Sequence, residues 1–236
     1  MGVDSMMRRG KICMSVTATD ADMVARTVQE NSGLVDLVEI RLDAMDRPEV
    51  DRCMQQVPLP LLFTNRPTWE GGNFSGSEEE RLRPLLQAAE LQASYVDLEL
   101  RADQSLREQL FEATRSSPTR LILSWHDFTS TPSTEELRDL IRQMRASGAD
   151  IGKIVTTAET NGDVLRVLAL LREAGKIGFP VSAFCMGTVG RISRFATIYL
   201  GGEMTYVAAS EDQATAPGQL SAARMNQLST LFTDEH

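Results

Sequence analysis

The chemistry available to this chain centres on one histidine and one lysine that lie 27 residues apart. His126 is one of two histidines, and the other is the last residue. Lys153 interrupts the apolar run 151–155, and the chain has only two further lysines. An ammonium in a buried strand costs free energy unless it is paired or neutral. A neutral lysine can form an imine with a ketone while a nearby histidine moves a proton, so the pair suggests imine chemistry.

Each of the two residues also has a purely structural interpretation. His126 could be a core histidine that is hydrogen-bonded to a neighbouring strand. Lys153 could extend its ammonium toward solvent along an apolar stem. Adjacent strands lie about 4.8 Å apart, so two side chains on neighbouring strands could reach one ligand. The pair is therefore a stronger signal than either residue alone.

Short apolar, β-branched runs alternate with amphipathic stretches along the sequence. Thr19-Asp20 is expected to cap a helix over 20–31, and acidic first turns predict helices over 78–92 and 134–147. A further helix is expected to open at Gly162-Asp163 and to end at Gly175. Strands are expected at 11–17, 36–43, 60–66, 95–100, 120–126, 151–157, 179–185 and 204–209. This alternation predicts an α/β fold, a single-domain (β/α)8 TIM barrel.

Polar residues recur on one face of several expected strands, near the strand ends. Barrel enzymes carry their catalytic groups at the carboxyl ends of the strands, and alternate side chains face the lumen. A packed lumen would favour Val, Ile or Leu at these positions instead. A lumen salt bridge between Glu39 and Arg41 is an equally good interpretation of that pair. The residues that share the inferred lumen face are Glu39, Arg41, Asp97, Glu99, Ser124 and His126, with Arg66 at the end of its strand.

Composition excludes some partners and leaves others open. The net charge of −9 and pI near 4.9 argue against a nucleic-acid or membrane partner. A small anionic substrate stays possible, because a local group of arginines can outweigh the mean charge. One internal histidine and no closely spaced cysteine pair argue against a metal site. Cys13, Cys53 and Cys185 are expected to be reduced thiols of a cytoplasmic protein.

The ends and loops complete the expected organisation. Residues 1–10 are expected to form a flexible N-terminal tail, and 11–236 the barrel catalytic domain. The glycine-rich stretch 71–76 is expected to be a loop after the third strand. The polar stretch 210–219, after the eighth strand, is long enough to act as a lid.

Seven short motifs together identify a family. The chain resembles the type I 3-dehydroquinate dehydratases, the Schiff-base enzymes of the shikimate pathway of aromatic amino acid biosynthesis. Each motif is short, but they cover nearly the whole chain in the family's order. The motifs are EIRLD (39–43), RPTWEGG (66–72), DLEL (97–100), SWHDF (124–128), Lys153, MGTVGRISR (186–194) and APGQ (216–219).

The resemblance implies a hydro-lyase that converts 3-dehydroquinate, a small anion, to 3-dehydroshikimate and water. It implies a TIM barrel, usually a homodimer, without cofactor or metal. Lys153 would form the imine, His126 would move the proton and Glu70 would orient His126. Arg194 would clamp the substrate carboxylate. Substrate binding is further implied for the ring-hydroxyl partners Glu39, Arg41 and Arg66, for the lid residues Thr215 and Gln219, and for Ser15.

Two departures from the family pattern stand at Thr215, where serine is common, and at Trp125, where tyrosine is often found. Thr215 keeps a hydroxyl, so we expect it to modulate lid closure. We also expect Arg41, Arg66 and Arg194 to surround Lys153 and to favour its neutral amine. Two other functions stay open at this point: another imine-forming barrel lyase, such as an aldolase, and a non-catalytic ligand-binding barrel.

Overall fold

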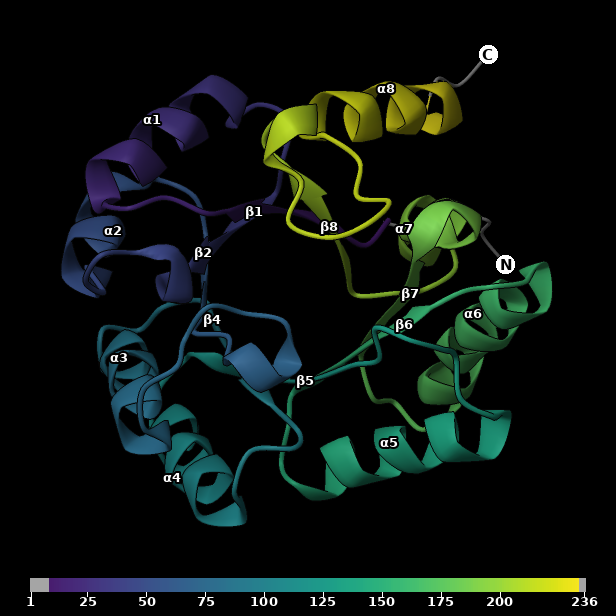
Figure 1. The fold of residues 1–236 in the computed structure, drawn as a ribbon, viewed down its shortest axis with the longest axis horizontal. Helices are drawn as coiled ribbons and strands as arrows, with labels where there is room; N and C mark the ends of the chain where they lie inside the picture. The colour runs from purple at the N-terminus through teal and green to yellow at the C-terminus, as the bar shows by residue number, and fades with distance from the viewer. Residues whose placement is uncertain (1–8, 234–236) are drawn as a thin grey trace, which may run out of the picture.

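Eight parallel strands form one sheet that curls into a barrel, and helices lie outside it (Figure 1). The computed structural model describes residues 9–233. The strands are β1 (Lys11–Val16), β2 (Leu37–Arg41), β3 (Leu61–Thr64), β4 (Tyr95–Glu99), β5 (Arg120–His126), β6 (Ile151–Thr157), β7 (Val181–Met186) and β8 (Met204–Ala208). The α-helices are α1 (Ala21–Asn31), α2 (Val50–Gln56), α3 (Glu78–Glu90), α4 (Gln104–Arg115), α5 (Thr134–Ala146), α6 (Asn161–Lys176), α7 (Gly187–Tyr199) and α8 (Ala222–Thr233). Short 3-10 turns are η1 (Leu42–Ala44), η2 (Thr68–Glu70) and η3 (Glu211–Gln213). The predicted (β/α)8 TIM barrel is confirmed.

Strand order follows chain order, as in a (β/α)8 barrel, where each crossover connects neighbouring parallel strands. The sheet runs β7-β6-β5-β4-β3-β2-β1-β8. The gap between its two edge strands is bridged at one end, where the Glu203 backbone N–H donates to the carbonyl of Val181 at 3.0 Å. The Met204 N–H donates to Ser182 Oγ at 3.1 Å beside it. The barrel is therefore nearly closed, and the carboxyl ends of all eight strands meet at one mouth.

Two separate apolar clusters show which way the strand side chains point. One cluster packs the outer faces of the strands against the helices, and includes Ile40, Leu98 and Ile154. The other fills the lumen with alternate residues of the strands: Cys13, Leu37, Leu62, Tyr95, Ile122, Ile151, Val155, Phe184, Met186, Met204 and Tyr206. Because side chains alternate along a strand, the lumen face continues into Glu39, Asp97 and Ser124. The predicted shared face is confirmed for these strands.

Local sequence signals fix most helix starts. Asp20 caps α1 by accepting from the Met23 N–H at 2.9 Å. Ser77, Ser133 and Thr160 each form a reciprocal capping box with an acidic residue three positions later. The predicted end of α6 at Gly175 was one residue short, because the helix continues through Lys176 and turns at Gly178, which has φ +64°. Four strands are one residue shorter than expected, and β2 and β3 are three residues shorter.

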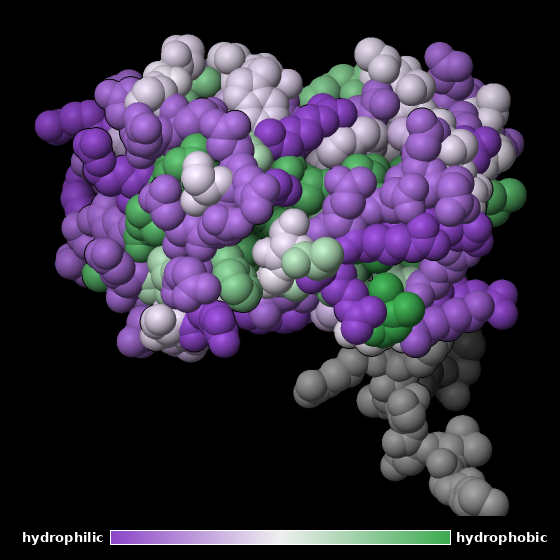
Figure 2. All heavy atoms as spheres, turned by 90° about the horizontal axis from the view of Figure 1, so that it is seen from below, coloured by the Kyte–Doolittle hydropathy of each residue, from purple (hydrophilic) through white to green (hydrophobic). Residues whose placement is uncertain are grey.

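The start of the barrel is tied down at its first described residues. Arg9 forms an ion pair with Asp36 at 2.6 Å, and the Gly10 N–H donates to the Ile198 carbonyl at 2.8 Å. The rest of the predicted tail, residues 1–8, lies outside the described residues. Within residues 9–233 no helix is long and apolar enough to cross a bilayer. Figure 2 shows the molecule from below, the side on which α4 and α5 lie in Figure 1. This face is mostly hydrophilic, with scattered apolar residues.

Candidate active site

A single cavity at the barrel mouth brings together all ten predicted site residues. It has an empty volume of about 530 Å³, including its open mouth, which is in the range of small-ligand pockets. Its walls come from seven strands or the loops after them, from α7 and from the loop after β8. The predicted residues that line it are Ser15, Glu39, Arg41, Arg66, Glu70, His126, Lys153, Arg194, Thr215 and Gln219.

Lys153 stands at the floor of this cavity, in the middle of β6. Its side chain is buried, with Nζ 3.3 Å from Asp97 Oδ2 and 3.5 Å from Glu39 Oε1. Nζ also lies 3.8 Å from the centre of the Tyr206 ring, so a π face covers it on one side. The immediate charged neighbours of the amine are therefore carboxylates. The expectation that arginines would form those surroundings was wrong, because Arg66 binds the carboxylates instead.

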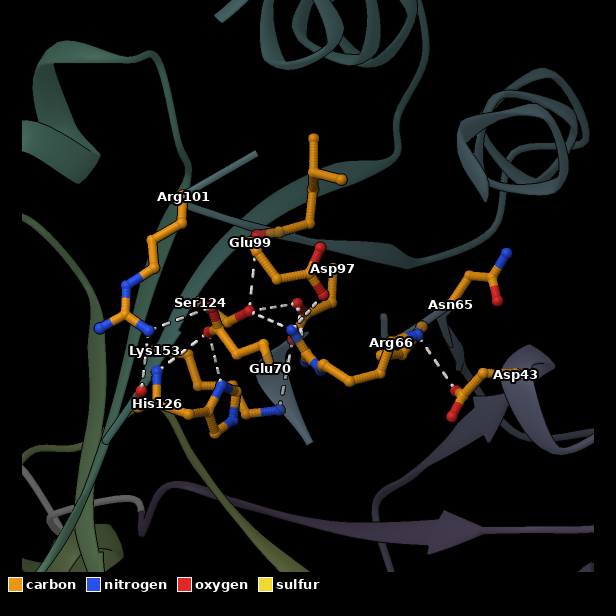
Figure 3. Close-up of polar contacts among 12 residues, drawn as sticks. Asp43, Asn65, Arg66, Glu70, Asp97, Glu99, Arg101, Ser124, His126 and Lys153 are labelled. Carbon is orange, nitrogen blue, oxygen red and sulfur yellow. Dashed lines mark hydrogen bonds and ion pairs between the residues drawn. The ribbon is translucent and has the colours of Figure 1, made fainter. Parts of the chain in front are cut away.

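Arg66 lies at the centre of a buried ion network below the mouth (Figure 3). Its guanidinium donates to Asp97 at 3.0 Å, to Ser124 Oγ at 2.7 Å and to Glu99. Arg81, which extends inward from α3 and is 1% exposed, binds the other oxygen of Glu99. Two buried arginines thus hold two buried carboxylates, one of which contacts Lys153. A carboxylate fixed in this way positions the amine.

Glu39 is the second carboxylate beside Lys153 at the floor of the cavity. Its carboxylate accepts from Ser15 Oγ at 2.5 Å and from Thr64 Oγ1 at 2.8 Å. Burial alone would raise the pKa of Glu39, but the charges of Lys153 and Arg41 and the hydrogen bond from Ser15 lower it to about 2. Glu39 is therefore an ionised, fixed acceptor next to the amine. Ser15 contacts this carboxylate directly.

His126 ends β5 and lines the cavity. In the sheet register Lys153 pairs with Ser124, so His126 lies one lumen position closer to the mouth than Lys153. Its Nδ1 lies 3.0 Å from Glu70 Oε1, and its backbone N–H donates to the same oxygen at 3.0 Å. Burial, followed by the charges of Arg66 and Lys153, lowers the pKa of His126 well below 6.5. The ring is thus neutral near pH 7. With Nδ1–H donating to Glu70, its Nε2 would be the free base.

Glu70 owes its position to the glycines that follow it. It ends η2 and is 1% exposed. Gly71 closes the turn with φ +77°, a conformation that favours glycine, and a Cβ there would overlap the Phe128 ring at 2.4 Å. Phe128 in turn stacks on the His126 ring at 5.9 Å. Burial raises the pKa of Glu70 to about 7, although Arg66 opposes this shift.

Arg41 is held at the rim by a residue to which sequence reasoning gave no role. Asp43 accepts from Arg41 Nε at 2.8 Å and from its terminal nitrogen at 2.6 Å. The same carboxylate accepts the backbone N–H groups of Arg66 and Asn73. Asp43 therefore joins the end of β2 to the loop that carries Glu70. A bidentate contact of this kind fixes the plane of the guanidinium.

Arg194 is the buried arginine without an acidic partner among the described residues. It is 1% exposed, lies 4.9 Å over the Phe184 ring, and donates only a long 3.3 Å bond to the Pro217 carbonyl. Its Nε is buried without a partner. Burial lowers its pKa to about 10. A buried cation is costly unless it is paired, so this group is suited to hold an anionic ligand.

The loop after β8 covers this side of the cavity (yellow in Figure 1). Gln219 Oε1 accepts from the Thr215 N–H at 2.7 Å and from its hydroxyl at 3.0 Å. Gly218 has φ +78°, and a Cβ there would lie 2.7 Å from the Gly187 carbonyl oxygen. Close backbone approach thus rests the loop on the start of α7. Both predicted lid residues line the cavity.

Comparison with known proteins identifies the family. The model of the family described as Type I 3-dehydroquinase matches residues 12–235. This chain belongs to that family. The 3-dehydroquinate dehydratase of Desulfotalea psychrophila is 43% identical over 219 residues, which cover 93% of this chain and 96% of that protein. The 3-dehydroquinate dehydratase of Methanocaldococcus jannaschii is 31% identical over 218 residues, 92% of this chain and 96% of that protein.

A solved structure agrees with the family match. The type I 3-dehydroquinate dehydratase of Clostridium difficile, solved with covalently modified comenic acid, superposes with a TM-score of 0.86. The two chains are 26% identical, over 95% of this chain and 92% of that one. As a member of the dehydroquinase family, this chain is an enzyme of the hydro-lyase class.

Several residues around this dehydroquinase site escaped the sequence interpretation. Tyr206 shares the lumen face of β8, so the period-two pattern could have found it. Arg81 contacts Glu99 from a helix 18 positions earlier in the chain, and no local pattern predicts that pairing. Arg101 lies in the turn after β4, where a charged residue would usually be solvated. Within residues 9–233, no group of three or more histidine, cysteine or acidic side chains is arranged to hold a metal ion.

Proposed function

We propose that this member of the type I 3-dehydroquinase family dehydrates 3-dehydroquinate to 3-dehydroshikimate in the shikimate pathway. The reaction would proceed through an imine on Lys153, with His126 as general base and general acid and with no metal or organic cofactor. One observation carries this proposal: a buried amine, a neutral imidazole and a buried arginine line one cavity, and the arginine has no acidic partner within residues 9–233.

The first step joins Lys153 to the substrate ketone and releases water. The amine must be neutral to attack, so the ammonium proton has to leave before or during binding. Asp97 and Glu39 keep Nζ within 3.5 Å of fixed oxygens, which limits its freedom. The protonated imine then draws electrons from the neighbouring carbon and makes its C–H bond more acidic. Lysine here serves as the electron sink that a cofactor would otherwise provide.

The second step is the proton transfer by His126. Its free nitrogen removes the proton next to the imine carbon, and the electron pair moves onto the imine nitrogen. The electrons then return to expel the hydroxyl one carbon further on, which leaves as water with the proton from His126. Hydrolysis of the imine releases the enone and restores the amine. A general base or acid of this kind typically contributes about 10²–10⁴-fold to the rate.

Binding would rely on the two unlike walls of the cavity. Arg194 would pair with the substrate carboxylate, since its Nε has no partner among the described residues. Glu39, Arg41 and Arg66 remain candidates for the ring hydroxyls. Arg66 has at least three acceptors already, so its role would be mainly to hold Asp97 and Glu99. Thr215 and Gln219 would close the loop over the bound ring.

The decisive experiment adds 3-dehydroquinate to the purified protein and follows two readouts. Dehydration produces a conjugated enone carboxylate that absorbs in the near ultraviolet, and sodium borohydride should fix an adduct that mass spectrometry maps to Lys153. An aldolase would also be trapped on lysine, but it would yield two fragments and no enone. A non-catalytic barrel would give neither product. Absence of enone at any protein concentration would overturn the proposal.

A variant of His126 separates its role from that of Lys153. In His126→Ala, the imine should still form and be trapped by borohydride, while elimination falls by about 10²–10⁴-fold. Full elimination activity in this variant would remove His126 from the role of base. The matched control is Arg115→Gln at the far end of α4, which should react at the parent rate, since that side chain is 69% exposed.

Assembly and location are further parts of the proposal. We propose a homodimer, which would cover apolar side chains that are exposed on α7, directly after it and on α8: Ile192, Leu200, Leu231 and Phe232. Sedimentation should give the dimer mass for the parent and the monomer mass for Phe232→Glu. We also propose a cytoplasmic location, in keeping with the three buried, unpaired cysteines.

A further inference from the structure

Arg101 is an arginine beside Glu70 and His126 to which neither the sequence nor the family match gave a role. It follows β4 directly, and its side chain turns toward the Glu70–His126 pair (Figure 3). Its terminal nitrogen lies 3.8 Å from Glu70 Oε2 and 3.4 Å from the His126 carbonyl oxygen. Its guanidinium stacks 4.9 Å from the centre of the Trp125 ring. Three contacts therefore aim one cation at this pair.

The oxygen that Arg101 faces is the one that the rest of the site leaves open. Glu70 Oε1 accepts both the ring and the backbone of His126. Glu70 Oε2 is buried and has no hydrogen-bond partner in the described part of the chain. A buried carboxylate oxygen without a donor favours protonation of that carboxyl group. Arg101, at 3.8 Å, is close enough to oppose this by its charge.

We propose that Arg101 is a positioning residue that keeps Glu70 ionised and His126 neutral, acting through the open oxygen of Glu70. This inference deepens the proposed function and rests on it for the roles of His126 and Glu70. Trp125 would serve by holding the guanidinium beside Glu70, which gives a use to a residue that departs from the family pattern. An ionised Glu70 accepts from Nδ1–H and leaves the other ring nitrogen free to take the substrate proton.

Charges from several elements act on the pair, and Arg101 is one of them. Glu70 faces the cations Arg66 and Arg101 and the anions Glu99 and Asp97. His126 faces four cations: Arg66, Lys153, Arg41 and Arg101. Arg66 is bound to Glu99 and Asp97, which offset much of its field at Glu70. The acidic oxygen nearest to Arg101 is Glu70 Oε2. Loss of Arg101 should therefore act directly on the pKa values of Glu70 and His126.

The charge of Arg101 determines the direction in which its loss should change the pKa values of Glu70 and His126. Its positive charge lowers both the pKa of Glu70 and the pKa of His126. Arg101→Gln should therefore raise both, and the pair should take up its proton at higher pH. We expect a rise of about half a pH unit or more in the midpoint, a moderate value because the side chain is 47% exposed. Arg101→Lys keeps the charge and should shift the midpoint less.

The test reads the imidazole directly by nitrogen-15 NMR of histidine-labelled protein. The chain has two histidines, so a His236→Gln background leaves only the two ring-nitrogen signals of His126. Titration curves are compared for this parent, for Arg101→Gln, for Arg101→Lys and for Arg115→Gln. The last variant loses the same charge at a distant, exposed position and should titrate like the parent. A curve for Arg101→Gln that superposes on the parent, or moves to lower pH, overturns the proposal.

A kinetic readout separates this role from simple attraction of an anionic substrate. The acidic limb of the kcat/KM profile reports groups of the free enzyme, so in Arg101→Gln it should move to higher pH by the same amount as the NMR midpoint. An arginine that only attracted substrate would raise KM and leave both midpoints in place, which would overturn the proposal. The titration needs no substrate. A failure of imine chemistry on Lys153 would therefore be seen in the turnover assay and would leave the titration result standing.

Discussion

The two sides of the cavity hold their buried arginines in opposite ways. On the β3–β5 side, Arg66 binds Asp97, Glu99 and Ser124. On the α7 side, Arg194 is as deeply buried but has no acidic partner within residues 9–233. Pairing compensates for burial on the first side only. Arg66 therefore helps to build the site, whereas the counter-ion of Arg194 must be a ligand.

The largest effect should come from the amine that the first side positions. Lys153→Met keeps the volume of the side chain but cannot form an imine, so kcat should fall by at least about 10⁴-fold. An anionic ligand should still bind, because Arg194 is untouched. Turnover and calorimetric titration with substrate measure the two quantities. Turnover near the parent rate would show that Lys153 does not take part in the reaction. Loss of substrate binding with activity retained would show that Lys153 binds the substrate and does not react with it.

Removing each arginine in turn tests the comparison itself. Arg66→Gln leaves Asp97 and Glu99 buried with fewer cations, and should lower the free energy of unfolding by about 3–5 kcal/mol. Arg194→Gln removes an unpaired cation, so the free energy of unfolding should be unchanged or higher. The same variant should raise KM by at least about 30-fold, since a truncated buried charge pair costs about 2 kcal/mol or more in binding. Urea unfolding and steady-state kinetics measure these effects. Equal losses of stability in both variants would contradict the distinction.

Two carboxylates of the site should respond to pH with opposite signs. The folded-state pKa of Glu39 is about 2, so its stabilising charge is fully present above about pH 4.5 and is lost as the pH falls toward 2. The folded-state pKa of Glu70 is about 7, so the protein loses stability as the pH rises from 4.5 to 7 and that group ionises. At pH 8, Glu70→Gln should raise the free energy of unfolding by up to about 3 kcal/mol, and Glu39→Gln should lower it by a similar amount.

Unfolding curves at pH 4.5, 6 and 8 measure this prediction. The gain from Glu70→Gln should vanish at pH 4.5, where the parent residue is already protonated. The loss from Glu39→Gln should persist there, because Glu39 is still ionised in the folded protein. A gain from Glu70→Gln that does not depend on pH would mean that packing, and not ionisation, is responsible.

The strands of the barrel and several lumen positions could be predicted from the sequence, because both follow from local periodicity. The roles of Glu70, Arg194 and the lid residues were implied only by the resemblance to the family, since these residues lie in loops or on a helix, where strand periodicity gives no signal. Alternation along β2, β4 and β5 predicted that Glu39, Asp97 and His126 share the lumen. The arginine environment of Lys153 was predicted wrongly, because ion pairing depends on contacts between distant elements. Nothing near Arg66 in the sequence indicates that Glu99 will be bound on its other side by α3.

The smallest effect should come from the lid, where the structure defines two separable hydrogen bonds. Gln219 Oε1 accepts both the backbone N–H and the hydroxyl of Thr215. Gln219→Ala removes both and should lower kcat/KM by about 10-fold, while Thr215→Ala removes one and should have a smaller effect, as expected for bonds worth about 0.7 kcal/mol each. Thr215→Ser keeps the hydroxyl and should retain nearly the parent value. If Thr215→Ser were as impaired as Thr215→Ala, the methyl group and not the hydroxyl would hold the lid, and the departure from the family's serine would be a packing feature.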